Sequence, residues 1–312
     1  MKVNCGDMIK QIRADMNLTQ EQLAVRLFID ARQVRRLENG GADMEIWQFM
    51  SMLEMLGCPA EDFWLLYLDS KEFDGYRAFR HVKRLLSERK FDEVKSELPK
   101  LEKGKLSEQP FIKQFVARAK IKIDETITDD EAIKKLYKII KMSNPNFEES
   151  KISEYRLTYN EVNIIIDLAG RLSKIDERDR AIDLQMAVID SRKKSRTTEE
   201  DRAALFPVIM SNLSSSLGLA GRYKESLKIC NEAIEICREY NNLRFVPKIL
   251  HNMASCYKEL GEERKIYEPI LIRGYHCAYA IGDTKTARLI KKDAEIDFGI
   301  TAHQKRSHYR FR

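Results

Sequence analysis

A group of arginines near the N-terminus is the first feature of this 312-residue chain that could do chemistry. Four guanidinium groups share an eleven-residue stretch, those of Arg26, Arg32, Arg35 and Arg36. A guanidinium presents a fixed fork of N–H donors that suits phosphate oxygens and the O6 and N7 acceptors of guanine. The first 68 residues nevertheless hold ten Asp and Glu against seven Lys and Arg. We therefore expect selective contacts from a few arginines rather than binding through a generally basic surface.

Asparagine and serine recur at a fixed offset in the C-terminal half. Gly221 and Gly261 lie forty residues apart, and residues that precede them match at the same spacing. The matching pairs are Asn212 with Asn252, Leu213 with Met253, Ser215 with Ser255, and Leu217 with Tyr257. A carboxamide carries both donors and an acceptor, so it can pair with the backbone of an extended peptide without reading its sequence. The alternative is that these asparagines bond to buried backbone within the chain's own fold.

The sequence contains no familiar pattern of catalysis or metal binding. There is no H-E-x-x-H, G-x-S-x-G or G-x-x-x-x-G-K-[ST] motif, and only five histidines are present. The six cysteines show no C-x-x-C pairing and no alternation with histidine: Cys5, Cys58, Cys230, Cys237, Cys256 and Cys277. Reduced core thiols are a better interpretation than metal or disulfide roles. We expect no catalytic residue, no metal and no cofactor.

The composition favours an all-α protein. Only 13 Gly and 7 Pro occur, while 43% of residues are hydrophobic and 33% are charged. No apolar run approaches the ~18–20 residues of a membrane span, and the first seven residues lack the apolar core of a secretory signal. We expect a cytoplasmic protein of about two helical domains that does not enter a membrane.

The first 68 residues predict five short helices, the first over 7–15. Thr19 and Gln22 have the spacing of a capping box, and Asp30 with Gln33 repeats that pattern at the next helix. Asn39-Gly40-Gly41 is expected to end this third helix. A fourth helix follows Asp43, with apolar residues at helical spacing, and a fifth covers 61–68. The apolar residues of the fourth helix are Ile46, Trp47, Met50, Leu53 and Leu56.

Helical periodicity continues beyond a polar connector at 69–75 to about residue 298. Turn-like sequences recur in this region, and the small-residue positions after these turns are spaced by 38 to 49 residues: Val94, Ala132, Ala181, Ser226 and Ile266. Each hairpin has an apolar face that only a neighbouring hairpin can cover. We predict a superhelical array of about five tetratricopeptide-like hairpins over 76–298, followed by a basic tail at 299–312. An irregular helical bundle is the alternative.

Two segments of the N-terminal region resemble the Xre/lambda-repressor class of helix-turn-helix domains. They are Leu18-Thr19-Gln20-Glu21-Gln22-Leu23-Ala24 and Val34-Arg35-Arg36-Leu37-Glu38-Asn39-Gly40. The resemblance covers about residues 6–67 and implies a DNA-binding domain over 1–68. Phe28 departs from the pattern, because the turn position that it occupies usually holds glycine.

An Xre domain followed by helical repeats in a chain of this length resembles the Rgg/PlcR group of regulators. These proteins are cytoplasmic receptors for short signalling peptides in quorum sensing. The resemblance implies a homodimer that binds double-stranded DNA through its N-terminal domain and a short signalling peptide on the concave face of its repeats. A transcription regulator of this kind also implies contact with RNA polymerase.

The helix-turn-helix resemblance assigns the candidate DNA-binding residues. The exposed N-terminal face of the second helix of such a motif enters the major groove. That face here holds Ala31, Arg32, Gln33 and Arg36, with Arg35 beside it, and Arg and Gln suit guanine and adenine respectively. Thr19 and Gln20 are placed at the preceding helix start to hold a backbone phosphate. Arg26 and Arg35 can also be ordinary solvated charges, and we expect Glu38 to pair with an arginine inside the domain.

The repeat resemblance assigns the candidate peptide-binding residues, because the first helix of each tetratricopeptide hairpin lines the concave face. They are Asn163, Asn212, Ser215, His251, Asn252 and Ser255. A second class of function fits the same pattern, namely a repeat-based protein-interaction regulator with weak or no specific DNA binding. The acidic balance of residues 1–68 favours that alternative, and the arginine cluster favours the DNA-binding regulator.

Overall fold

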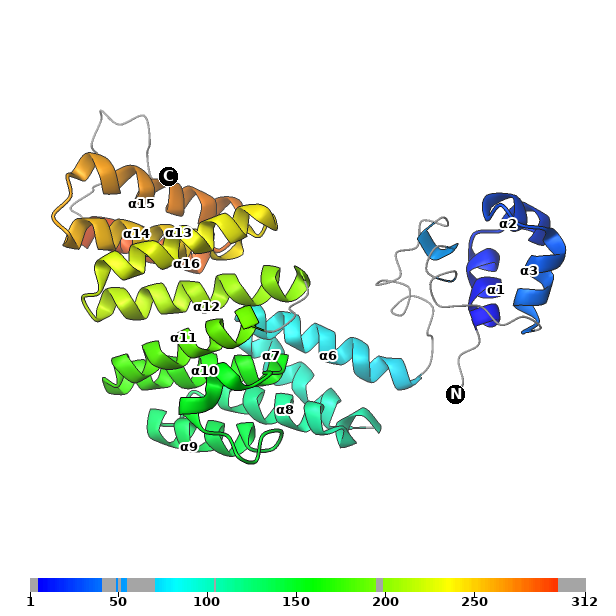
Figure 1. The fold of residues 1–312 in the computed structure, drawn as a ribbon, viewed down its shortest axis with the longest axis horizontal. Helices are drawn as coiled ribbons and strands as arrows, with labels where there is room; N and C mark the ends of the chain where they lie inside the picture. The colour runs from blue at the N-terminus through cyan, green and yellow to red at the C-terminus, as the bar shows by residue number, and fades with distance from the viewer. Residues whose placement is uncertain are drawn as a thin grey trace. The chain divides into compact units, whose positions relative to one another are not determined.

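The computed structural model describes residues 5–40, 49, 52–54, 71–103, 105–194 and 199–296, and regular structure within these ranges is helical throughout (Figure 1). The predicted all-α class is therefore confirmed. The chain divides into two compact units, Met1–Ile112 and Lys113–Arg312. Most of the two helices predicted over 43–68, and the tail at 299–312, lie outside the described residues. No helix in the described ranges is long and apolar enough to cross a membrane.

Three short helices, α1 (Cys5–Asp15), α2 (Gln20–Arg26) and α3 (Ala31–Glu38), surround one apolar cluster. The side chains of this cluster recur every three or four positions, as an amphipathic helix requires. They are Met8, Ile9, Ile12, Leu23, Ala24, Leu27, Val34, Phe49 and Leu53. Burial of Leu53 agrees with its predicted inward orientation.

Both predicted capping boxes are present. Thr19 Oγ1 accepts a hydrogen bond from the Gln22 amide at 3.1 Å, and Gln22 Oε1 accepts one from the Thr19 amide at 2.8 Å. Asp30 accepts from the Arg32 amide at 2.6 Å, and Gln33 Oε1 accepts from the Asp30 amide at 3.2 Å. An isolated helix of seven or eight residues is unstable in water. Each cap contributes about 1 kcal/mol toward offsetting that deficit.

The turn between α2 and α3 forms around a left-handed phenylalanine. Phe28 has φ +56°, and the amide of the next residue, Ile29, donates to Ala24 O at 3.0 Å. This is the hydrogen bond that ends many helices at a glycine. A residue with a Cβ pays about 1–2 kcal/mol in this conformation. The ring is 88% exposed, so burial of the side chain does not offset the strain.

The repeats begin with α6 (Lys71–Ser87) and α7 (Phe91–Glu97), which pack on the short 3-10 helices η1 (Leu98–Glu102) and η2 (Lys105–Glu108). Much of the predicted connector at 69–75 is thus the first turn of α6. All four elements belong to the unit Met1–Ile112.

Four further hairpins and a terminal helix follow in chain order. They are α8 (Pro110–Ile123) with α9 (Asp129–Ile140), α10 (Tyr159–Leu172) with α11 (Arg178–Lys194), α12 (Glu199–Leu219) with α13 (Tyr223–Glu239), α14 (Val246–Glu259) with α15 (Arg264–Ala280), and finally α16 (Thr284–Ile296). Short 3-10 helices lie between some of them: η3 (Glu149–Glu154), η4 (Ser173–Ile175) and η5 (Leu243–Phe245). The described residues therefore contain the predicted five hairpins.

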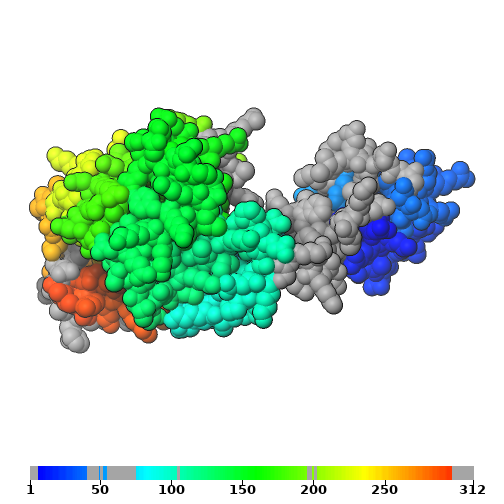
Figure 2. Space-filling view, turned by 90° about the horizontal axis from the view of Figure 1, so that it is seen from below, coloured from blue at the N-terminus to red at the C-terminus, as the bar shows by residue number. Residues whose placement is uncertain are grey.

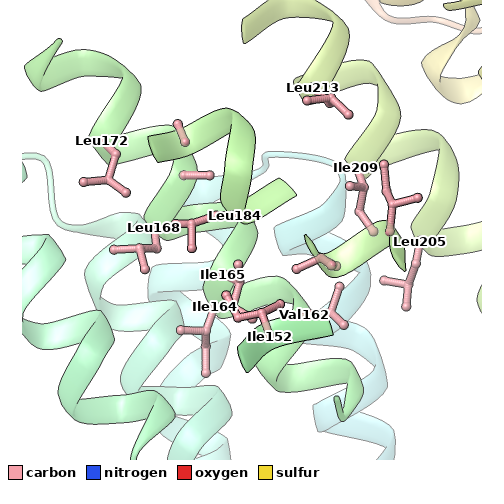
Figure 3. Packing of buried hydrophobic residues seen from close by; sticks show 14 of the residues in the cluster. Ile152, Val162, Ile164, Ile165, Leu168, Leu172, Leu184, Leu205, Ile209 and Leu213 are labelled. Carbon is pink, nitrogen blue, oxygen red and sulfur yellow. The ribbon is translucent and has the colours of Figure 1, made fainter. Parts of the chain in front are cut away.

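Most of the second unit shares one long apolar core, and its last helices share a smaller one. Buried residues from Ile121 to Ile249 form a continuous cluster that passes from each hairpin to the next. Ile165 and Leu168 of α10 and Ile209 and Leu213 of α12 belong to it (Figure 3). In the space-filling view the segments coloured green to yellow form one continuous packed surface (Figure 2). A second cluster joins α14, α15 and α16.

The forty-residue recurrence marks helix ends. Gly221 and Gly261 have φ +75° and +80°, and the amides of Arg222 and Glu262 donate to carbonyls five residues earlier, at 2.9 and 3.1 Å. Left-handed residues with side chains end other helices in the same way: Asn17, Arg89, Asp176 and Asn241. Glycine therefore reveals only some of these ends in the sequence.

Four of the five positions that recur after the turns are buried: Val94, Ala132, Ala181 and Ser226. Ile266 differs from the other four, because it is 37% exposed. Val94, Ala132 and Ser226 lie four positions after the residue that caps their helix, whereas Ile266 lies three positions after the cap of α15, Glu263. The shift by one residue turns Ile266 out of the buried stripe.

Replacing Phe28 by glycine should stabilise the N-terminal helices. The substitution removes about 1–2 kcal/mol of left-handed strain, of which glycine's freedom in the unfolded chain returns about 0.5–1 kcal/mol. Both tryptophans, Trp47 and Trp64, belong to residues 1–68, so urea unfolding can be followed by their fluorescence. Phe28→Ala is the matched control, since it removes the ring but keeps the Cβ. Equal midpoints for the two variants would contradict the strain.

Candidate nucleic-acid and peptide interfaces

A buried carboxylate holds the helix-turn-helix motif together. Glu38, 4% exposed at the end of α3, accepts from Arg13 Nε at 2.6 Å and from Arg13 Nη2 at 3.1 Å. Its Oε2 also accepts from Gln20 Nε2 at 2.7 Å. Arg13 Nη1 reaches on to Leu18 O at 3.0 Å. One carboxylate thus links α1, α2 and α3, which confirms the predicted pairing of Glu38 with an arginine inside the domain.

The charge state of this network follows from its geometry. Burial alone would raise the pKa of Glu38, but the hydrogen bonds from Arg13 and Gln20 and the charge of Arg13 hold that pKa below its ordinary value. The same contact raises the pKa of Arg13. Glu38 is therefore ionised at neutral pH, and the bidentate pair fixes where α3 lies against α1 and α2.

The predicted recognition face is largely open to solvent. Arg32, Gln33, Arg35 and Arg36 are exposed on α3, and Ala31 is half-buried. Arg32 and Arg36 stand four positions apart, so their side chains share one face of the helix. This arrangement would let both guanidinium groups meet the same ligand.

Three of the residues predicted to contact DNA also make hydrogen bonds within the domain. The Gln33 carboxamide oxygen is part of the Asp30 capping box, so a bidentate contact with adenine would have to break that box. Thr19 is exposed, and its hydroxyl caps α2. Gln20 is half-buried: its amide nitrogen donates to Glu38, and its oxygen lies 3.5 Å from Arg35 Nε. Capping and the Glu38 network thus position these side chains.

The two recurring asparagines have different surroundings. Asn252, on α14, is 9% exposed, and its amide nitrogen donates to Ser211 O at 3.1 Å and to Ser214 Oγ at 2.8 Å on α12. Asn212, on α12, is half-buried, and its oxygen accepts from Lys248 Nζ at 2.9 Å. Asn252 therefore satisfies the alternative interpretation of bonding within the array. Asn212 is the more exposed of the two asparagines, so it is the one that a peptide could reach.

The other candidate peptide-binding residues are half-buried on first helices of their hairpins. Asn163 donates to Tyr159 O at 2.8 Å within α10, and Ser255 donates to His251 O at 3.0 Å within α14. His251 Nε2 lies 3.1 Å from Asp293 Oδ2 on α16. Ser215 lies on α12, three positions beyond Asn212. The contact between His251 and Asp293 connects α14 and α16, whereas the bonds of Asn163 and Ser255 lie within their own helices.

A charged cluster between α8 and α10 was not predicted from the sequence. Arg118 Nε donates to Asp167 Oδ2 at 2.6 Å, and Lys122 Nζ pairs with the other carboxylate oxygen. Burial works against ionisation of Asp167, but the two cations lower its pKa below the ordinary value. The signal was available, since Asp167 interrupts the apolar run from Ile164 to Ala169 and a lone carboxylate there requires cationic partners.

The described cysteines of the repeats are free thiols. Burial raises the pKa of Cys230 and of Cys237 to about 11 each, which keeps both protonated at neutral pH. In the described part of the chain, no group of three or more His, Cys, Asp and Glu side chains could hold a metal ion.

No protein-family profile matches the sequence, and no curated protein is significantly similar to it. Solved structures do share the fold. Bacillus thuringiensis PlcR in complex with the peptide PapR7 and DNA has 19% identity and a TM-score of 0.68, with 92% of this chain and 98% of that chain covered.

Two further structures extend this likeness. ComR from S. thermophilus in complex with DNA and its signalling peptide ComS has 15% identity and a TM-score of 0.61, over 95% of this chain and 100% of that chain. A cysteine-to-serine variant of the Streptococcus dysgalactiae SHP pheromone receptor Rgg2 has 12% identity and a TM-score of 0.58, over the same shares. The predicted resemblance to the Rgg/PlcR group is thus confirmed for the fold, a helix-turn-helix domain followed by tetratricopeptide-like repeats.

Removing the charge of Glu38 should loosen the N-terminal helices. Glu38→Gln leaves the half-buried Arg13 without its counter-ion, and breaking such a pair costs about 3 kcal/mol. Folding lowers the pKa of Glu38, so its contribution is complete above the ordinary value of 4.5 and is lost as the pH falls through the lower folded-state value.

Tryptophan fluorescence during urea unfolding, at a series of pH values, measures both effects. The wild type should lose stability between neutral and acidic pH more steeply than Glu38→Gln. Asp15→Asn, which removes an exposed carboxylate of α1, should behave as the wild type. Parallel pH profiles for wild type and Glu38→Gln would mean that this carboxylate is not ionised in the folded domain.

Proposed function

We propose that this protein is a cytoplasmic transcription regulator that binds operator DNA as a homodimer and is switched by a short signalling peptide. The single observation that carries the proposal is the exposed arginine face of α3, held in place by the buried Glu38 network. The structures of PlcR and ComR with DNA and peptides, and of Rgg2 as a pheromone receptor, support both partner classes. Control of transcription would include contact with RNA polymerase.

Base reading is assigned to Arg32 and Arg36. They lie one turn apart on the exposed face of α3, and each guanidinium can take the O6 and N7 of a guanine. Arg35 points its Nε toward Gln20 at 3.5 Å, so these two side chains suit a shared phosphate better than a base. Thr19 and the start of α2 would contribute amides to the same phosphate.

Dimerisation follows from the size of the recognition element. An eight-residue helix contacts only a few base pairs, which is too little for useful selectivity in a genome. Two copies about 34 Å apart would read the two halves of a symmetric site. The repeats supply the remaining surface for association.

Peptide binding is assigned to the half-buried polar side chains of first helices α10, α12 and α14. Asn212 and Lys248 are central to this proposal, because their 2.9 Å contact bridges two adjacent hairpins and both side chains are half-buried. A peptide backbone can use both the carboxamide and the ammonium. Ser215, His251, Ser255 and Asn163 extend the polar row along neighbouring turns.

Loss of a recognition arginine should weaken specific binding. Arg32→Ala and Arg36→Ala should each cost about 1–3 kcal/mol on the selected site and relax the choice at one base position. Gln20→Ala should weaken all duplexes more evenly, because a phosphate contact carries no base information.

Fragments of the organism's genome, selected with the wild-type protein, provide the duplexes, and fluorescence anisotropy gives the affinities. Selection of the same base at every position by both arginine variants would refute the recognition-helix assignment. Failure of the wild type to select any fragment would favour the alternative, a protein-interaction regulator without specific DNA binding.

Substitutions at Asn212 and Asn252 should have different effects, the first on peptide binding and the second on the stability of the repeats. Asn212→Ala removes about 0.5–1.5 kcal/mol of hydrogen bonding and should weaken peptide binding roughly two- to tenfold with little change in thermal stability. Asn252→Ala removes two buried hydrogen bonds between α14 and α12, so it should destabilise the repeats by about 1–3 kcal/mol.

Calorimetric titration of the full chain with peptides from neighbouring short reading frames, beside thermal unfolding, tests this pair. Asn231→Ala is the matched control, since Asn231 is exposed on a second helix, α13. Loss of peptide binding in a thermally unchanged Asn252→Ala would instead place Asn252 in direct contact with the peptide.

A further inference from the structure

Helix α6 carries a concentration of positive charge that nothing in the proposed recognition face uses. From Arg77 to Lys90 the chain has six Lys and Arg residues and one acidic residue, Glu88. The apolar stripe of α6 is buried, with Val82, Leu85 and Leu86 at its centre. Arg77, Arg80 and Arg84 lie on the exposed remainder of the helix surface.

The spacing of these arginines places like charges next to one another. Residues three and four positions apart are neighbours on a helix. The neighbours of Arg80 at these distances are Arg77, Lys83, Arg84 and Tyr76, and none is acidic. Among the described residues, no carboxylate lies within ion-pair distance of Arg80. Such an arrangement destabilises an isolated helix.

Elsewhere the same chain pairs its surface cations along the helix. Lys100 bonds to both oxygens of Glu97 at 2.7 Å, three positions away. Arg222 makes a bidentate pair with Glu225, and Arg238 pairs with Glu235 at 2.7 Å. Arg84 is paired less closely, since its Nε is 4.0 Å from Glu88 Oε1 while Glu88 lies 3.0 Å from Lys90 Nζ. Arg84 also contacts His81 Nδ1 at 3.3 Å. An imidazole carries no negative charge, so this contact does not neutralise the guanidinium.

The acidic balance of residues 1–68 suggests a role for the positive charge of α6 in DNA binding. Residues 1–68 carry more acidic than basic groups, whereas non-specific DNA affinity depends on the number of phosphates that cations neutralise. Arg80 and Arg84 lie about 6 Å apart along the helix axis, and DNA presents one charge per about 1.7 Å of its own axis. An arginine fork binds phosphate oxygens in a bidentate manner.

We infer that the exposed arginines of α6, Arg80 and Arg84 foremost, form a second DNA contact that binds backbone phosphates outside the bases read by α3. This inference rests on the proposed DNA-binding function and adds a phosphate-binding element to it. The contact contributes affinity without sequence selection, and it compensates for the acidic balance of the helix-turn-helix segment.

The salt dependence of DNA affinity tests the inference with the full-length chain. Each phosphate contact contributes about 0.9 to the slope of log Kobs against log salt concentration. Arg80→Ala/Arg84→Ala should therefore lower that slope by roughly two on the selected fragment and on a mixed-sequence duplex of equal length. Arg80→Lys/Arg84→Lys keeps both charges and should retain most of the slope.

Arg222→Ala/Arg238→Ala is the matched control, because it removes two arginines whose charges are paired with Glu225 and Glu235 at 2.7 Å. An unchanged slope in Arg80→Ala/Arg84→Ala, or an equal fall in the control, would overturn the inference. If Arg80→Ala/Arg84→Ala had the salt dependence of the wild type while Arg32→Ala lost site selection, the proposed function would stand without the α6 contact. A wild type that bound no duplex at any salt concentration would refute both. Amide hydrogen exchange of α6, which should be no faster in the alanine variant, verifies that the helix is intact.

Discussion

Each helical hairpin in the repeats has an apolar face that water would solvate unless the next hairpin covered it. The buried cluster that runs without a break from Ile121 to Ile249 is the consequence of this constraint. A polar side chain within such a core must find a partner, because an unpaired buried donor or acceptor costs about 1–3 kcal/mol. Asn252 meets this requirement on α12, and Gln114 donates to Ile139 O at 3.1 Å on α9. The apolar faces hold the stack together, and the buried polar residues specify how one hairpin sits on the next.

The same physics explains what could and could not be predicted from the sequence. The capping boxes at Thr19 and Asp30 and the helix ends at Gly221 and Gly261 depend on local spacing or on a residue type with one main structural use. The difference between Asn212 and Asn252 was not predictable, because it depends on how deeply each side chain is buried between α12 and α14. Phe28 shows the same limit: the turn forms at the usual place, although the residue lacks the freedom of glycine. The sequence marks Asp167 as a lone carboxylate in an apolar run, but its partner Arg118 lies 49 positions away, and only the folded structure identifies it.

The N-terminal helices bury a small apolar core, and a buried ion pair between Glu38 and Arg13 adds to their stability. Few apolar residues are available to α2 and α3, which have seven and eight residues. The ionised Glu38 compensates by tying three helices through Arg13 and Gln20, at the cost of one buried carboxylate. Because this network holds α3 from its buried side, the opposite side is left to exposed arginines. Stability and ligand contact are therefore assigned to different faces of one short helix.

A stacked array also limits how a bound peptide could act on the rest of the chain. Each hairpin contacts mainly its neighbours, so a ligand changes the array only by favouring one arrangement of adjacent hairpins over another. The contact between Asn212 and Lys248 bridges α12 and α14, and the His251–Asp293 pair continues the connection to α16. A peptide that competes for Asn212 or Lys248 would alter the polar bonds that set this register while leaving the apolar core intact. Its effect on DNA binding could not exceed its differential affinity for the two arrangements, and a preference of about 5.5 kcal/mol is needed to reverse a 1:99 equilibrium. A short peptide could reach that figure only through several bridging contacts of this kind, together with apolar side chains buried between helices.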